Sequence, residues 1–188
     1  TELAELTIVK ETIGGDGSFD FTSTTLAPAA FTITTTSGTG SEVFADLLPG
    51  TYDVAETIPS GWDLTSASCS DGSPITAIGL SAGESVTCTF TDTELYTISG
   101  AVSIYDYDLE TFVGFEGVTI TYGTGLTETT DENGEYNFII DHGWNGTITP
   151  SMTGYIFKPI NSVVGPVESN LTQDFTAYIE LIDVSIDG

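Results

Sequence analysis

The sequence predicts an all-β protein made of two β-sandwich domains in tandem. Turn-forming pairs such as Pro49-Gly50 and Asn133-Gly134 recur along the chain at the short spacing that is typical of sandwiches and open barrels. Between the turns lie short runs in which apolar and polar residues alternate, which is the period of a half-buried strand. Residues that are β-branched or aromatic are frequent, and they favour strands over helices.

A polar stretch at residues 91–94 divides the chain into two domains. It follows the alternating run 86–90, and a new run begins at Tyr96. We therefore expect a first domain at residues 1–94 and a second at residues 95–180, with almost no linker between them. The tripeptide Thr-Glu-Leu occurs at residues 1–3 and again at 93–95, which hints at a tandem array or an end-to-end fibre.

Residues 181–188 continue beyond the expected end of the second domain. Ile182, Val184 and Ile186 alternate with polar residues, like a strand that lacks a sheet. An unpaired strand can add to the sheet edge of a neighbouring molecule. We therefore expect this segment to be a C-terminal strand or a linker to a neighbour.

The charge of the chain excludes several classes of function. The 188 residues include 28 Asp and Glu against 2 Lys and Arg, which gives a formal net charge of -26. Nucleic acids and anionic membranes are not expected as partners, because no basic surface is available to neutralise phosphates. No apolar run reaches the roughly 18–20 residues of a membrane-spanning helix. The single histidine, His142, has no metal-ligand spacing and no catalytic partner near it, so no metal site and no enzyme acting on an external substrate are expected.

Three ionisable residues in the first domain, Lys10, Glu56 and Asp92, fall on apolar strand faces. Each follows apolar residues at the strand period of two: Leu6 and Ile8 before Lys10, Tyr52 and Val54 before Glu56, and Val86, Cys88 and Phe90 before Asp92. If these strands share one core, an amine and two carboxylic acids meet away from water. Burial favours the neutral forms of such groups.

A buried amine beside two carboxylic acids has a specific chemistry. A neutral amine is a nucleophile, and a hydrogen-bonded carboxylic acid is an electrophile. The expected product is an isopeptide bond, an amide between Lys10 Nζ and Asp92 Cγ formed with loss of water, while Glu56 shuttles protons and polarises the Asp92 carbonyl. This self-crosslinking happens once per chain and needs no cofactor. The alternative is an ordinary ion pair among the same residues.

The run from Phe44 to Trp62, with its Leu-Pro-Gly turn and its Tyr-x-Val-x-Glu strand, resembles a known family. It is similar to the B-type repeat domains of Gram-positive collagen-binding adhesins and pilins, also called prealbumin-like domains. The resemblance covers essentially the whole first domain and implies an immunoglobulin-like or prealbumin-like β-sandwich. It also implies that Lys10 on the first strand bonds to Asp92 on the last, assisted by Glu56. Asp stands here where Asn is commoner in the family, so water would leave instead of ammonia.

Cys69 and Cys88 are the only cysteines of the chain. Two cysteines in one domain of a Thr-rich, Lys-poor chain that we expect to be exported favour a disulfide. It would close a loop of about 20 residues and contribute roughly 3 kcal/mol of stability. A pair of buried free thiols is the alternative.

In the second domain, residues 130–136 have the pattern Thr-Asp-x-Asn-Gly-x-Tyr, in which Asn133-Gly134 forms a hairpin turn. This hairpin resembles that of the carboxypeptidase-regulatory-like repeats of large bacterial surface proteins. The first strand of this domain carries no Lys, so no second crosslink is expected. Lys158, the remaining cation, is interpreted as a surface residue paired with carboxylates, with an inter-subunit crosslink as the alternative.

Other polar residues are secondary candidates. Asp106 with Asp108, and Asp131 with Asn133, offer oxygens that suit Ca²⁺, but no calcium-binding loop motif surrounds them and solvated turns are expected. Possible N-glycosylation sequons begin at Asn145 and Asn170.

These features together predict an exported structural protein at the cell surface. We expect the subunit of an extracellular filament, pilus or surface fibre that self-associates by strand addition through residues 181–187. The alternative is a stalk or ligand-binding module of an adhesin, in which exposed aromatic residues such as Trp62 and Trp144 contact glycans or another host ligand.

Overall fold

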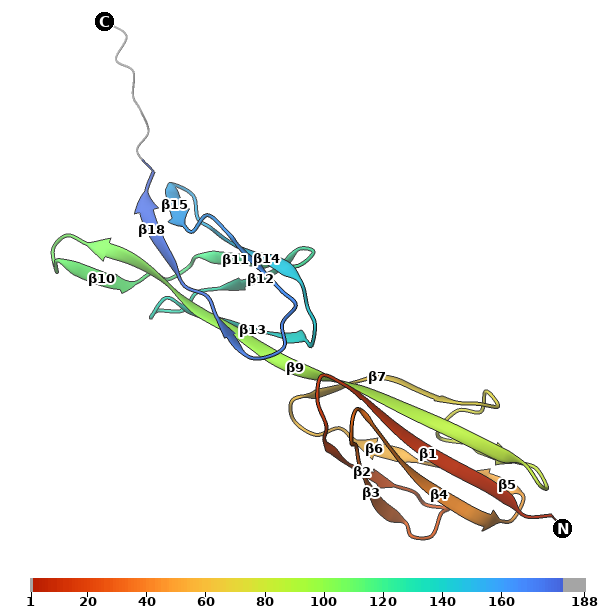
Figure 1. The fold of residues 1–188 in the computed structure, drawn as a ribbon. Helices are drawn as coiled ribbons and strands as arrows, with labels where there is room; N and C mark the ends of the chain where they lie inside the picture. Colours follow the sequence, from red (N-terminus) through yellow and green to blue (C-terminus); the bar gives the residue numbers. More distant parts are fainter. Residues whose placement is uncertain (1, 181–188) are drawn as a thin grey trace, which may run out of the picture. The chain divides into compact units, whose positions relative to one another are not determined.

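The computed structural model describes residues 2–180, and within that range the chain forms β-strands and no helix (Figure 1). The all-β prediction is therefore confirmed. Accordingly, this part of the chain has no helix long and apolar enough to cross a membrane. The chain divides into two compact units, Thr1–Leu95 and Tyr96–Gly188, called unit 1 and unit 2 below. The predicted strand containing Ile182, Val184 and Ile186 lies outside the described residues.

Unit 1 is a sandwich of short strands. They are β1 (Ala4–Ile13), β2 (Ser18–Thr22), β3 (Ala30–Thr34), β4 (Thr39–Leu47), β5 (Gly50–Tyr52), β6 (Ala55–Thr57), β7 (Trp62–Cys69), β8 (Ile78–Leu80) and the first part of β9 (Ser85–Asp106). One sheet has the order β7-β9-β1-β4, in which β1 and β9 run parallel. A second sheet has the order β3-β2-β6, and β5 pairs with β8.

The core of unit 1 follows directly from the strand period of two. Every second residue of β1 from Ala4 to Lys10 is buried, as is every second residue of β9 from Val86 to Asp92. Phe19 and Phe21 of β2 are fully buried and belong to the same core cluster. The inward faces of both sheets are therefore apolar except at a few positions.

Unit 2 is also a two-sheet structure. Its strands are the second part of β9, β10 (Thr111–Gly114), β11 (Thr119–Tyr122), β12 (Leu126–Thr129), β13 (Glu135–Asp141), β14 (Gly146–Ser151), β15 (Tyr155–Lys158), β16 (Ser162–Val164), β17 (Leu171–Thr172) and β18 (Phe175–Ile179). In one sheet β9 pairs with β10, β13, β17 and β18, and β15 extends the sheet beyond β18. The other sheet has the order β12-β11-β14-β16. β18 runs parallel to β9, so the first and last described strands of this unit are neighbours.

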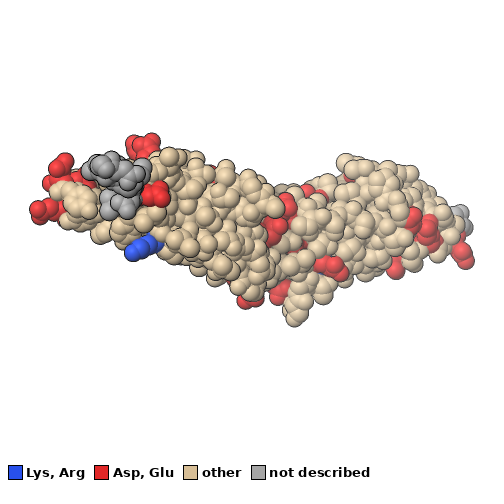
Figure 2. Space-filling model, turned by 90° about the horizontal axis from the view of Figure 1, so that it is seen from above, with Lys and Arg blue, Asp and Glu red and all other residues tan. Residues whose placement is uncertain are grey.

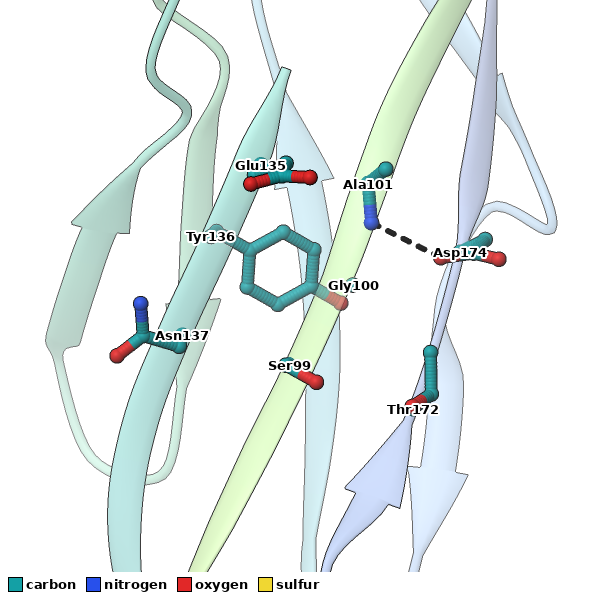
Figure 3. A pocket seen from close by; sticks show the side chains of 8 residues that line it. All are labelled: Ser99, Gly100, Ala101, Glu135, Tyr136, Asn137, Thr172 and Asp174. Atoms are coloured by element: carbon teal, nitrogen blue, oxygen red, sulfur yellow. Dashed lines mark hydrogen bonds between the residues drawn. The ribbon is translucent and has the colours of Figure 1, made fainter. Parts of the chain in front are cut away.

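A close backbone approach in unit 2 requires a glycine at position 100. A Cβ at Gly100 would collide with the carbonyl oxygen of Gln173 and would lie 2.9 Å from the Tyr136 hydroxyl. That hydroxyl donates a hydrogen bond of 2.5 Å to the same carbonyl oxygen. Figure 3 shows the Tyr136 ring reaching from β13 to Gly100 on β9, with Thr172 and Asp174 on the other side. Asp174 accepts a hydrogen bond of 2.9 Å from the Ala101 amide.

We expect Gly100→Ala to destabilise unit 2 by roughly 3 kcal/mol, because the new methyl group meets a backbone carbonyl that cannot rotate away. Thermal unfolding measured by circular dichroism should show a lower Tm for the transition of this unit. Gly79→Ala is the matched control, since a Cβ at Gly79 would make only an ordinary contact of 3.9 Å with Ser73. Equal melting of the Gly100→Ala variant and the natural chain would contradict this account.

Candidate crosslinking site

The three ionisable residues that interrupt the apolar strand faces meet in the core of unit 1. Lys10 lies on β1 and Asp92 on the adjacent, parallel β9, two residues beyond the position that pairs with Lys10. Glu56 lies on β6 of the other sheet, where it pairs with Phe21. Residues that are far apart in the sequence are thus brought together between two sheets.

The geometry of this cluster is that of a dry, closely contacting set of charges. Lys10 Nζ lies 2.9 Å from Glu56 Oε1 and is in direct contact with Asp92 Oδ1. The side chains of Lys10 and Asp92 are 0% exposed, and that of Glu56 is 1% exposed. The ring of Phe19 covers the amine, with its centroid 4.4 Å from Nζ. No side of the cluster is left open to bulk water.

Burial governs the acid–base behaviour of Glu56. Loss of hydration raises the pKa of this carboxyl above its usual value, the hydrogen bond and charge of Lys10 oppose the rise, and the Asp92 carboxylate adds to it. A carboxyl group with a raised pKa that touches an amine is suited to accept and return a proton. The arrangement can therefore persist as an ion pair or serve as the reactants of an amide.

Two structural features lie beside the buried cluster. A β-bulge on β7, between Leu64 and Ser66, lies opposite Asp92, and bulges bend a strand so that neighbouring side chains are re-aimed. Trp62 packs edge-to-face against Phe19 at 5.2 Å between ring centroids. The ring that covers the Lys10 amine therefore also contacts a second aromatic ring.

Cys69 of β7 and Cys88 of β9 form a disulfide, and no free cysteine remains in the described residues. The two residues lie directly opposite each other in the pairing of these strands. Cys88 is on the same inward face of β9 as Asp92. Strand β9 is therefore covalently joined to one neighbour and contacts Lys10 of the other neighbour through Asp92.

The raised pKa of Glu56 gives a pH dependence of known sign. The folded state holds a proton on Glu56 at pH values where the unfolded chain has released it, so this residue's contribution to stability falls as pH rises from about 4.5 through the folded pKa. We expect the difference in free energy of unfolding between Lys10→Ala and Lys10→Ala/Glu56→Gln to shift over that window in favour of the Gln variant. Both variants lack the amine, so amide formation does not enter the comparison. Urea titrations at several pH values measure this difference in free energy of unfolding. A difference that does not change with pH would contradict the raised pKa of Glu56.

The prediction that Trp62 and Trp144 are exposed is wrong. Both are half-buried, Trp62 against Phe19 and Trp144 against Phe138 at 6.5 Å between ring centroids. A large indole ring is seldom left in water when a core lies beside it. Exposed aromatic residues occur instead in unit 2, at Tyr105, Tyr107, Phe112 and Tyr178. The only sequence signal for these exposed aromatic residues is that they occupy strand positions expected to face outward.

The candidate calcium ligands form turns. Asp106 accepts hydrogen bonds from the backbone amides of Asp108 and Leu109, and Asp131 accepts them from those of Asn133 and Glu135. Among residues 2–180 no group of three or more His, Cys, Asp or Glu side chains is placed to hold a metal ion. Acidic residues are scattered among uncharged ones over the face drawn in Figure 2.

The remaining candidates are peripheral. Lys158 is exposed on β15, and its Nζ lies 5.2 Å from the centroid of the Tyr178 ring. Asn145 and Asn170 are exposed, with Asn145 donating a hydrogen bond to the Gly143 carbonyl. The ring of His142 is half-buried and lies 5.9 Å from that of Tyr96.

Comparison with known families addresses unit 1 directly. Residues 6–94 match the family model of the prealbumin-like fold domain. Unit 1 contains a prealbumin-like domain. The match includes the three residues of the buried cluster and both cysteines. The likeness of unit 2 to carboxypeptidase-regulatory-like repeats stays a prediction.

Individual proteins are more distantly similar. Chitinase ChiA of Flavobacterium johnsoniae is 26% identical over 119 residues, which are 61% of this chain and 7% of that enzyme. The chain thus spans a small part of the length of this relative. Among solved structures, the TIE protein of Bacillus anthracis is similar with a TM-score of 0.40 and 19% identity, over 94% of this chain and 34% of that one. The minor pilin GBS52 of Streptococcus agalactiae has a TM-score of 0.39 and 13% identity, over 95% of this chain and 97% of that one.

Proposed function

We propose that this chain is a structural segment of an extracellular filament, pilus or surface fibre, and that unit 1 is locked by an isopeptide bond between Lys10 and Asp92. The observation that supports the bond is the contact of Lys10 Nζ with the Asp92 carboxyl in a fully buried site of a prealbumin-like domain. A structural role fits a domain family without enzymatic activity.

The chemistry balances without any cofactor. The Lys10 ammonium gives a proton to the Asp92 carboxylate, with Glu56 as the relay, which leaves a neutral amine and a carboxylic acid. Nζ then attacks Asp92 Cγ, Glu56 removes a proton from nitrogen, and the same proton leaves with the departing hydroxyl as water. Direct contact of the reactants inside a rigid core replaces the collision that the reaction needs in solution. Exclusion of water also disfavours hydrolysis of the product.

Intact-mass measurement under non-reducing conditions tests the bond. The natural chain should be lighter than its sequence by one water for the amide and two hydrogens for the disulfide. Lys10→Ala should lack only the two hydrogens. Asp92→Asn is a sharp control, because it loses ammonia instead of water and so gives a product of the same mass as the natural chain. A natural chain that retains the water would overturn the isopeptide proposal.

Assembly by strand addition is the second part of the proposal. It rests on the alternation of Ile182, Val184 and Ile186, which suits a strand that pairs with the sheet of a neighbouring subunit. Deletion of residues 181–188 should leave a folded monomer that forms no filaments in electron microscopy. Filaments of the shortened chain would show that another surface drives assembly.

A second candidate function is an accessory module that holds a larger cell-surface or secreted protein on a polysaccharide. The similarity to a small part of a chitinase favours it. Retention of the purified chain on insoluble chitin, with no ordered polymers of the chain itself, would favour this function over the filament.

A further inference from the structure

Four large apolar side chains form a row across one sheet of unit 2. Phe112 of β10 pairs directly with Tyr105 of β9, and their rings meet edge-to-face at 5.3 Å. Tyr178 of β18 pairs directly with Ile156 of β15. The parallel register of Ala177 with Ile104 places Tyr178 next to Tyr105. We call Phe112, Tyr105, Tyr178 and Ile156 the cross-strand row.

The cross-strand row lies on the outer face of the sheet. Phe175 and Ala177 of β18 point into the core, so Tyr178 points outward. The four residues are 37–54% exposed: Tyr105 37%, Tyr178 41%, Ile156 47% and Phe112 54%. With neighbouring strands about 4.8 Å apart, the row is about 14 Å long. Large apolar side chains gathered on an outer face mark an interaction site more often than scattered ones do.

A hollow adjoins the row. It has a volume of about 240 Å³ and is lined by Ile104, Tyr105, Tyr107, Ala177, Tyr178 and Ile179. Tyr107 is 79% exposed, and its ring packs edge-to-face against that of Tyr105 at 5.0 Å. Together the row and the hollow offer aromatic surfaces with phenolic hydroxyls at their tips.

Exposed acidic residues lie in the turn beside the row, together with the exposed Leu109. The turn between β9 and β10 carries Asp108 and Glu110, both exposed, and Asp106 ends β9. Lys158 places its amine 5.2 Å from the Tyr178 ring centroid. Carboxylates accept hydrogen bonds from hydroxyl groups, whereas they repel an anionic polymer. They would also repel the same face of a second copy of the chain, since its turn carries the same acids.

The geometry points to the cross-strand row and its hollow as a binding platform for a neutral polysaccharide. A sugar ring presents a face of C–H groups, which packs on an aromatic surface, and a rim of hydroxyls, which hydrogen-bond to tyrosine and carboxylate oxygens. A row that crosses four strands can contact several sugars of one linear chain. This inference rests on the second proposed function and assigns that function to particular residues.

Retention of the whole chain on insoluble chitin and cellulose, both neutral, tests the platform, with an alginate gel as the anionic comparison. The natural chain should be retained on at least one neutral polysaccharide and not on alginate. Tyr105→Ser/Tyr178→Ser should lower the affinity by about tenfold or more, because two central aromatic contacts are lost. Ile139→Ser/Val163→Ser is the matched control, since it removes two exposed apolar residues, 64% and 82% exposed, that do not belong to the row.

The outcomes separate the platform from the function on which it rests. Retention that is equal in the row variant and the natural chain would overturn the platform while the polysaccharide function stands. A natural chain that binds neither neutral polysaccharide would overturn both. Self-association that the row variant abolishes, without polysaccharide binding, would make a second copy the occupant and would also overturn the inference. If the double variant melts early, Tyr107→Ser, at a highly exposed position, replaces it.

Discussion

Pulled from its two ends, the chain is expected to release the length of unit 2 while unit 1 releases almost none. The proposed amide between Lys10 and Asp92 would join the first strand of unit 1 to its last strand, so tension would pass through the crosslink and bypass the residues between. No such bond is expected in unit 2, whose first strand carries no Lys, so unit 2 should extend by roughly 250–300 Å, at about 3.5 Å per residue. Single-molecule force spectroscopy measures these lengths.

The Lys10→Ala variant is the matched test of this expectation. Without the amide, unit 1 should add a second extension of roughly 200–250 Å, shortened because the Cys69–Cys88 disulfide still closes 19 residues. Reduction of this disulfide should lengthen the extension of unit 1 by about 65 Å in the variant. It should leave the natural chain unchanged, because the disulfide lies inside the segment that the amide bypasses. A natural chain that releases both units would contradict the crosslink.

Asp92→Ala is expected to bring unit 1 close to unfolding. The variant loses the crosslink, and closing a loop of about 80 residues contributes about 4–5 kcal/mol in the chain-entropy model. It also leaves Lys10 as a free ammonium in the core with Glu56 beside it, and a buried charge that has lost a partner costs about 3–5 kcal/mol. The sum is comparable to the whole stability of a typical domain. Guanidinium unfolding followed by circular dichroism measures the loss.

A second variant separates the two causes. Lys10→Met added to Asp92→Ala removes the poorly compensated ammonium without restoring the crosslink, so it should recover about 3 kcal/mol relative to Asp92→Ala alone. If Asp92→Ala unfolds at the same denaturant concentration as the natural chain, neither the ion pair nor the amide stabilises unit 1.

The strand period accounts for how much of the site the sequence predicts. Lys10, Glu56 and Asp92 each end an alternating run, and a period of two is enough to assign their side chains to inward strand faces. The period does not say which strands are neighbours. The parallel pairing of β1 with β9 and the place of Glu56 on the other sheet depend on pairings between distant segments. The family resemblance implied only that Lys10, Asp92 and Glu56 act together.

The cross-strand row could not be predicted from the sequence for the same reason, because it depends on which strands are neighbours. In the sequence, nothing distinguishes Tyr105, Phe112 and Tyr178 from other outward-facing strand residues. The register of β10, β9 and β18 brings them together into one surface. The tryptophans were the more conspicuous aromatic residues of the sequence. They pack against phenylalanines because burial of a large ring stabilises the fold more than exposure does.

The parallel pairing of β9 with β18 has a mechanical consequence for unit 2. Load would enter unit 2 through its part of β9, which begins at Tyr96, and leave at the end of β18, so it would slide the two strands past each other. The backbone hydrogen bonds between the two strands would then be loaded together instead of breaking one after another. They join the pairs Val102 and Phe175, Ser103 and Thr176, and Ile104 and Ala177. Although no disulfide joins its described strands, unit 2 is thus expected to yield abruptly at a threshold force.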